Sequence, residues 1–115
     1  MNIAIIGSGT MGNGIAHVFA QNGHSVALVD VSEAALQRGL QTISGNLERQ
    51  IKKEIITEAD KTAILQRITP HADLATGVAQ AELVVEAASE NVDVKLQIFK
   101  QLDEFVPATA ILASN

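Results

Sequence analysis

Apolar residues along the chain form short continuous runs that alternate with stretches in which apolar positions recur every three or four residues. A short continuous run is typical of a strand buried on both faces, and the longer repeat is typical of an amphipathic helix. The pattern predicts strands at residues 3–6, 25–29, 82–86 and 110–113 and one beginning at Ile68, with helices at about 11–22, 33–53, 57–65 and 92–102 and a helical turn at 74–78. Strands that alternate with helices predict an α/β fold with a parallel, doubly wound sheet.

The first predicted helix has an apolar stripe that we expect to be its buried side. The stripe consists of Met11, Ile15, Val18 and Phe19. His17 lies off this stripe, while His24 and His71 fall in predicted turns and loops. We therefore expect all three histidines at the surface, and none of them has the spacing to other ligands that a metal site needs.

About forty residues separate Asp30 from Ile68, although about a dozen suffice to connect two parallel strands. The apolar repeat predicts that this excess forms a helical hairpin between the second and third strands. The hairpin is either a packing element or an arm on the substrate side of the molecule. Arg49, Lys52 and Lys53 near its tip would meet phosphates in the second case, or complement the helix dipole in the first.

A glycine-rich motif follows the first predicted strand directly and leads into a helix. Its spacing, GxGxxG, is that of a dinucleotide-binding loop when an acidic residue ends the second strand, as Asp30 does here. Gly7 allows the tight turn, Gly9 the approach of a pyrophosphate, and Gly12 close packing of the helix on the sheet. The cofactor contacts predicted in this loop are Gly7, Ser8, Gly9, Thr10, Met11 and Gly12.

Asp30 predicts which dinucleotide binds. A carboxylate at this position can accept hydrogen bonds from both hydroxyls of the adenosine ribose, and it repels a 2′-phosphate. NAD is therefore favoured over NADP. The alternative is that Asp30 only shapes the turn before the next helix, for which Ser32 is the better N-cap.

Parallel sheets bind ligands at the carboxyl ends of their strands, where we expect the glycine loop, Asp30, residues 86–90 and residues 114–115 to meet. Glu90 would accept a hydrogen bond from a ribose hydroxyl there. Lys95 falls near the start of its helix, where a cation opposes the helix dipole, so an anionic partner is expected. Its alternatives are a contact with Asn91 or Glu90, or simple exposure to solvent.

Length and composition narrow the classes of function. With 115 residues the chain forms one domain, too small to include a separate substrate domain. A net charge of −5 and the lack of Tyr and Trp argue against nucleic acid as a partner. The chain has no Cys, which excludes disulfides and thiolate catalysis, and no apolar stretch long enough for a membrane span. We expect a cytoplasmic protein that binds no membrane.

Four segments of the chain carry a resemblance to one family. They are the glycine motif, the stretch from Leu83 through Glu90 to Lys95, Phe99, and the ending Ile111–Asn115. Together they resemble the NAD-dependent L-3-hydroxyacyl-CoA dehydrogenases, which include the 3-hydroxybutyryl-CoA dehydrogenases. The resemblance covers the whole chain and implies the NAD-binding, Rossmann-like N-terminal domain of that family, in fatty-acid or butanoate metabolism. In the family a helical C-terminal domain completes the active site and forms the homodimer.

The resemblance also implies roles for single residues. Asp30 would hold the adenine ribose, and Glu90 and Lys95 the cofactor near the nicotinamide, with Lys95 also near the substrate. Asn46 and Lys53 match hairpin positions that meet the CoA part of an acyl-CoA substrate in relatives. The chain departs from the family pattern at Glu54, where relatives often have Gly.

Oxidation of a 3-hydroxyl needs a base for the O–H proton while hydride leaves for the nicotinamide ring. In the family this base is a His paired with a Glu, assisted by a Ser, and all three lie downstream of Asn115. We therefore expect no catalytic residue within this chain and little or no turnover by it alone. The alternatives are an NAD-binding module without redox chemistry, or a related dehydrogenase acting on another hydroxy acid.

Overall fold

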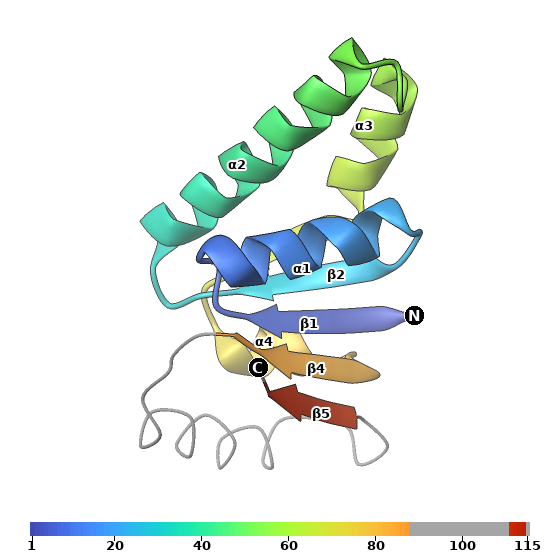
Figure 1. Ribbon diagram of the computed structural model, residues 1–115. Helices are drawn as coiled ribbons and strands as arrows, with labels where there is room; N and C mark the ends of the chain where they lie inside the picture. Colours follow the sequence, from blue (N-terminus) through green and yellow to red (C-terminus); the bar gives the residue numbers. More distant parts are fainter. Residues whose placement is uncertain (88–110, 115) are drawn as a thin grey trace.

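The computed structural model describes residues 1–87 and 111–114, which contain a parallel sheet with the strand order β3-β2-β1-β4-β5 (Figure 1). The strands are β1 (Asn2–Ile6), β2 (Ser25–Val29), β3 (Ile68–His71), β4 (Leu83–Glu86) and β5 (Ile111–Ser114). Each neighbouring pair is parallel. The doubly wound sheet predicted from the sequence is therefore confirmed. The helix expected at 92–102, together with Glu90 and Lys95, lies outside the described residues.

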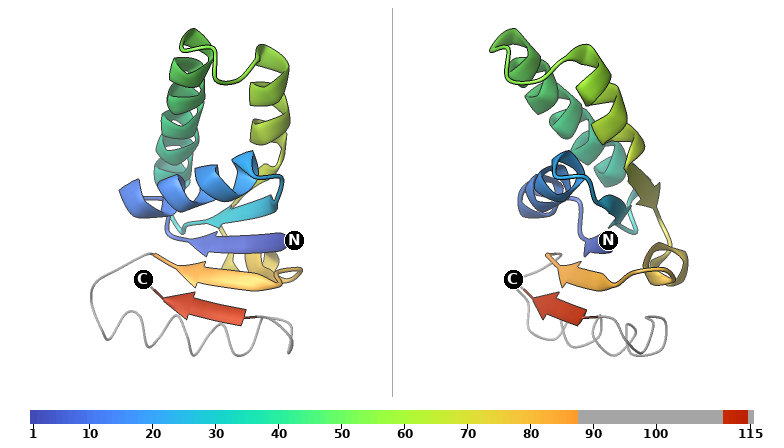
Figure 2. Two further views of the ribbon diagram at one scale, coloured as in Figure 1. Left: turned by 45° about the vertical axis from the view of Figure 1, so that its right-hand side comes forward. Right: turned by 90° about the vertical axis from the view of Figure 1, so that its right-hand side faces the viewer.

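The helices of the described residues lie on both faces of this sheet (Figure 2). They are α1 (Thr10–Gln21), α2 (Glu33–Lys52), α3 (Glu58–Gln66) and the short α4 (Leu74–Val78). The hairpin of α2 and α3 projects beyond α1, on the face opposite α4. The expected hairpin between the second and third strands is therefore present.

The sheet separates two apolar clusters. Ile3 and Ile5 of β1 belong to the cluster with α1, α2 and α3, whereas Ala4 and Ile6 belong to the one with α4. Successive residues of a strand point to opposite faces, so a strand covered on both sides must be apolar throughout. This explains why β1 is recognisable as a continuous run.

The buried side of α1 differs from the one that its apolar residues predict. Met11 is 54% exposed and Val18 60%, so the predicted stripe was wrong for these two, while Ile15 and Phe19 are partly buried. The buried residues of α1 are Gly12, Asn13, Ala16, His17 and Ala20. The reason is the close approach of the helix to β1, which admits small residues where a large apolar side chain would not fit.

His17 is also placed differently from the prediction, because it is only 9% exposed. Its Nε2 lies 2.8 Å from Gln21 Oε1, and Gln21 Nε2 donates to Gln50 Oε1 at 2.7 Å. These bonds satisfy polar groups between α1 and α2, so His17 is a structural link between the helices. His24 and His71 are partly exposed.

The hairpin has well-defined helix ends. The apolar repeat that predicts the hairpin is confirmed on α2, where Leu36, Ile43 and Leu47 are buried. At the tip, Glu54 has a positive φ of 61°, and its N–H donates to Ile51 O while Ile55 N–H donates to Gln50 O. This bond pair is the Schellman motif, whose left-handed position usually holds glycine. Glu54 therefore keeps the turn although it replaces the expected Gly.

The helices of the hairpin are joined by an ion pair in which Lys61 Nζ lies 2.6 Å from Glu48 Oε1. The hydrogen bond from Lys61 lowers the pKa of Glu48 below its ordinary value. At the start of α3, Thr57 and Asp60 form a reciprocal capping box. The hairpin is thus held together by the capping of its helices and by its buried apolar side chains as well as by this ion pair.

Substitution of Gly12 tests the close approach of α1 to β1. A Cβ at Gly12 would lie 1.7 Å from the carbonyl oxygen of Gly7. We expect Gly12→Ala to destabilise the fold by about 3 kcal/mol or more in urea unfolding, because backbone must move. The control is Gly14→Ala, where a Cβ meets nothing within 4 Å. Equal stability of the two variants would contradict this account.

Substitution of Glu54 tests the hairpin turn. Glu54→Gly removes the strain of a side chain at positive φ, so we expect it to raise the free energy of unfolding by about 1 kcal/mol. Glu54→Ala keeps the strain and removes the same charge, and it should leave stability nearly unchanged. A gain in Glu54→Ala as large as that in Glu54→Gly would assign the effect to charge instead.

Candidate functional site

The carboxyl ends of the strands bring the predicted cofactor-binding residues of the described part together at one edge of the sheet (Figure 1). The glycine loop leaves β1 beside the end of β2, where Asp30 follows. On the other side of β1, Glu86 ends β4 in register with Ile6 of β1 and Ser114 of β5. Glu86 is fully buried in this layer. The described parts of the predicted edge therefore end neighbouring strands, whereas residues 88–90 and 115 lie outside the described residues.

The glycine loop is shaped by backbone contacts. Gly7 has a φ of 102° and its N–H donates to Val29 O at 2.7 Å, which ties the turn to β2. Gly12 then lies against Gly7. At Gly9, in contrast, a Cβ would meet nothing within 4 Å, so the outer side of the loop is open to a ligand.

The start of α1 differs from the starts of the other described helices. Its N-cap is Gly9, and no side chain accepts a hydrogen bond there. Side chains cap the others, with Ser32 at α2, Thr57 at α3 and Asp73 at α4. No acidic residue stands in the first turn of α1 either. The N–H groups and positive dipole end of α1 therefore fit an anion from outside the chain, as a pyrophosphate would be.

Asp30 is held in place by three hydrogen bonds. Its Oδ2 accepts from Ser8 N at 3.1 Å and from Ser8 Oγ at 2.9 Å, and its Oδ1 accepts from Ser32 N at 3.0 Å. Burial raises the pKa of Asp30, but the bonds from Ser32 and Ser8 and the charge of Arg38 lower it further than that, so the pKa lies below the ordinary value. The carboxylate is therefore ionised and oriented at the edge where a ribose would lie.

The alternative reading of Asp30 as a turn residue is partly right. The bond to Ser32 N–H does shape the turn before α2, whereas Ser32 itself is the N-cap and accepts from Ala35 N–H. The link between Asp30 and Ser8 could not be deduced from spacing, because it joins residues on two different strand ends.

A pocket of about 250 Å³ lies between the glycine loop and α2. It is lined by Ser8, Gly9, Thr10, Asn13, Ala35, Arg38, Gly39 and Thr42. Arg38 was missed by the sequence reasoning, which found no cation near Asp30. The sequence carries only a weak signal for Arg38, because a single Arg on the exposed face of a helix, here in the second turn of α2, is ordinary.

Comparison with known proteins agrees with this geometry. The family model of the 3-hydroxyacyl-CoA dehydrogenase NAD-binding domain matches residues 2–115. The chain belongs to this family. A 3-hydroxybutyryl-CoA dehydrogenase of Bradyrhizobium diazoefficiens is 45% identical over 113 residues, which cover 98% of this chain and 38% of the relative.

Two solved structures of 3-hydroxybutyryl-CoA dehydrogenases have the same fold. The Escherichia coli K12 protein superposes with a TM-score of 0.96 at 41% identity, covering 100% of this chain and 24% of its own. The Ralstonia eutropha protein gives 0.95 at 46% identity, covering 99% of this chain and 40% of its own. The chain thus spans well under half the length of these family members. NAD is the cofactor of the matched domain.

The predicted substrate residues lie along the hairpin, away from the glycine loop. Asn46 is half-buried and its Oδ1 accepts from Arg49 Nη2 at 2.5 Å, while the exposed Lys53 is the C-cap of α2. A groove of about 420 Å³ runs along the same helix between Arg38 and Arg49. The exposed side of α2 therefore carries cations along its length, from Arg38 beside the glycine loop to Arg49 and Lys53 toward the tip of the hairpin.

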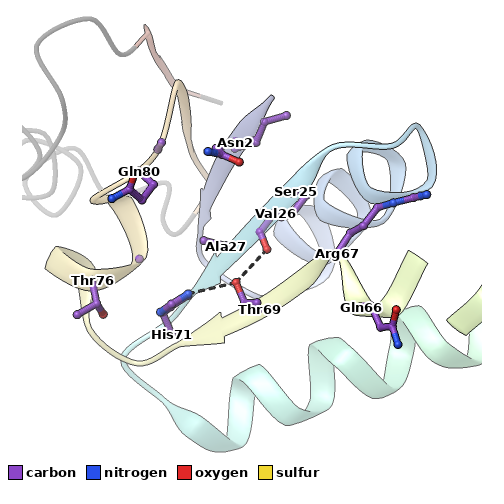
Figure 3. A pocket seen from close by; sticks show the side chains of 13 residues that line it. Asn2, Ser25, Val26, Ala27, Gln66, Arg67, Thr69, His71, Thr76 and Gln80 are labelled. Carbon is purple, nitrogen blue, oxygen red and sulfur yellow. Dashed lines mark hydrogen bonds between the residues drawn. The ribbon is translucent and has the colours of Figure 1, made fainter. Parts of the chain in front are cut away.

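A different pocket, of about 350 Å³, lies on the face of the sheet that carries α4 (Figure 3). Thr69 Oγ1 lies 3.2 Å from His71 Nε2 and donates to Val26 O, and Arg67 Nη1 donates to Ala20 O. The ionisable side chains lining it are only Arg67 and His71 among the described residues. The side chains of Arg67, Thr69 and His71 are thus engaged with the protein, and the pocket lies on the face opposite α1.

Within residues 1–87 and 111–114, no three His, Cys, Asp or Glu side chains are grouped as metal ligands. No helix in the same residues is both long and apolar enough to cross a membrane.

The pKa of Asp30 predicts how stability depends on pH. The pKa of Asp30 is lower in the folded state than in the unfolded state, where it is about 4. The ionised carboxylate therefore stabilises the fold fully above the unfolded pKa, and this stabilisation is lost as the pH falls through the folded pKa. We expect Asp30→Asn to be less stable than the parent by ~1 kcal/mol at neutral pH, with a gap that shrinks below about pH 4. Urea unfolding of both proteins measures this gap. A gap that widens on acidification would contradict the assigned hydrogen bonds.

Proposed function

We propose that this chain is the nucleotide-binding part of an enzyme that oxidises 3-hydroxyacyl-CoA to 3-oxoacyl-CoA with NAD. The observation that carries the proposal is the uncapped start of α1 beside the ionised Asp30, in a domain whose family binds NAD. Relatives with this domain are named 3-hydroxybutyryl-CoA dehydrogenases. Oxidation of a 3-hydroxyl then passes hydride to the nicotinamide when NAD is bound.

The geometry of the sheet edge supports a role for each residue there. Residues 7–12 hold the pyrophosphate with backbone N–H groups, and Asp30 accepts from the hydroxyls of the adenine ribose. The order of the strands then directs the nicotinamide toward the ends of β4 and β5. Glu90 and Lys95 remain predictions for that end of the cofactor.

The acyl-CoA substrate is proposed to lie on the hairpin side. Support comes from the exposed Lys53 and from Asn46 beside Arg49, since CoA carries phosphates that such groups bind. Lys95 is proposed to touch both cofactor and substrate. The proton-transfer groups and the contacts of a homodimer are proposed to lie in further residues, because the relatives are much longer than this chain.

A role in fatty-acid metabolism fits these relatives. A cytoplasmic location stays a prediction from composition, since one relative, from Rattus norvegicus, is named as a mitochondrial enzyme.

The proposal is tested by calorimetric titration with NAD and NADP. Asp30→Ala removes an acceptor of ribose hydrogen bonds, so NAD binding should weaken by about 1 to 3 kcal/mol and the preference over NADP should narrow. Glu58→Ala, which removes an exposed carboxylate in α3, serves as the control and should leave both affinities unchanged. Unchanged discrimination in Asp30→Ala would show that Asp30 has only its structural role.

A further inference from the structure

The chain contains two methionines and no cysteine, so an oxidant of sulfur can attack only thioethers in it. Both methionines are open to solvent, since Met1 is 59% exposed and Met11 is 54% exposed. They lie at opposite ends of β1, because Met1 precedes the strand and Met11 follows the glycine loop at its carboxyl end. One exposed thioether therefore stands in the candidate nucleotide site, and the other lies the length of a strand away from it.

Met11 projects from the side of α1 that faces away from α2. Asn13 faces α2, because a Cβ at Gly39 would lie 3.7 Å from the Cβ of Asn13. Residues two positions apart on a helix are separated by about 200° around its axis. Met11 is therefore directed away from the hairpin and toward the β4 side of the sheet, since α1 runs between the hairpin and β4 (Figures 1 and 2). The nicotinamide half of the cofactor is proposed to lie on this side.

The thioether of Met11 also lies close to the place proposed for the pyrophosphate. Met11 is the second residue of α1, and a helical side chain points back toward the N-terminus of its helix. Its sulfur is thus directed over the first turn, where no side chain caps the N–H groups. A dinucleotide that extends from this turn toward the end of β4 would pass over Met11 and cover it.

We propose that Met11 is a site of oxidation by hydroperoxides, and that oxidation of this side chain weakens the binding of NAD. The inference rests on the proposed function, because it concerns the same nucleotide site. When the oxidant is hydrogen peroxide, an S–O bond forms at the thioether as the O–O bond breaks. The sulfur is oxidised to a sulfoxide, and the peroxide is reduced to water. Bound NAD, in turn, protects the thioether by covering it.

The sulfoxide weakens binding because it changes the polarity of a surface that the cofactor covers. A thioether is apolar and adapts its shape to a neighbour, whereas a sulfoxide is polar and its oxygen accepts hydrogen bonds strongly. Covering that oxygen removes its water, which is unfavourable unless a donor replaces the water. The nearest donors are the uncapped N–H groups of the first turn of α1, which the pyrophosphate also uses. The sulfoxide therefore competes with the cofactor for these donors.

The first experiment measures protection by NAD. The folded chain is treated with hydrogen peroxide, with and without NAD, and peptide mass spectrometry follows each methionine. Without NAD, Met1 and Met11 should react at similar rates, because they are similarly exposed. With NAD at about ten times its Kd, oxidation of Met11 should slow by roughly tenfold, as the free site is depleted, and that of Met1 should not change. Equal rates at Met11 with and without NAD, or equal protection of both methionines, would overturn the proposal.

The second experiment measures the effect of oxidation on affinity by calorimetric titration with NAD. The oxidised parent should bind NAD about tenfold more weakly than the untreated parent. Met1→Leu keeps Met11 and should show the same loss after treatment. In Met11→Leu the affinity after treatment should equal the affinity before it, since this variant oxidises only at Met1. Leu nearly conserves the volume of Met, and circular dichroism confirms that each sample is folded.

The outcomes separate this inference from the proposed function. If the untreated chain binds NAD and the oxidised chain binds it equally well, the inference is wrong and the nucleotide site stands. A loss in Met11→Leu as large as in the parent would assign the effect to another residue and also overturn the inference. Methionine sulfoxide reductases should restore the affinity of the oxidised parent, and a loss that persists after reduction would contradict the role of the sulfoxide. If the untreated, folded chain does not bind NAD, the proposed function fails and the inference fails with it.

Discussion

The structure depends on the contact between the start of α1 and the end of β1. Gly12 and Gly7 meet so closely that no side chain fits between them, and this contact fixes the axis of α1 over the carboxyl edge of the sheet. Because Gly9 caps the helix without a side chain, its N–H groups and dipole stay directed at that edge. The same contact therefore determines both the packing of the core and the position of the proposed anion site.

The remaining features of the site are arranged around this helix. Asp30 stands one strand away and is bonded to Ser8 of the loop, so the acid and the helix end are parts of one hydrogen-bonded unit. Farther along α1, His17 contacts Gln21 of the same helix and Gln50 of α2, and these contacts join α1 to the hairpin. The hairpin, which carries Asn46, is thereby held in a defined position relative to the candidate nucleotide site.

Much of this arrangement follows from the sequence, because strands buried on both faces and long amphipathic helices have strong patterns. The glycine motif and Asp30 were identified by spacing, and α2 was recognised from Leu36 to Ile51. The buried side of α1 was not, since close packing on a sheet favours small residues over large apolar ones, which left Val18 exposed. Arg38 was missed because its significance comes from a neighbour on another element.

The central claim is that a pyrophosphate rests on the uncapped start of α1, and backbone amide NMR tests it most directly. During titration of the ¹⁵N-labelled chain with NAD, the largest shift changes should fall on residues 8–12 and Asp30, with little change at Gln66 and Gln80, which line the pocket of Figure 3. Changes concentrated at Gln66 and Gln80, or none at residues 8–12 at saturating NAD, would contradict the account.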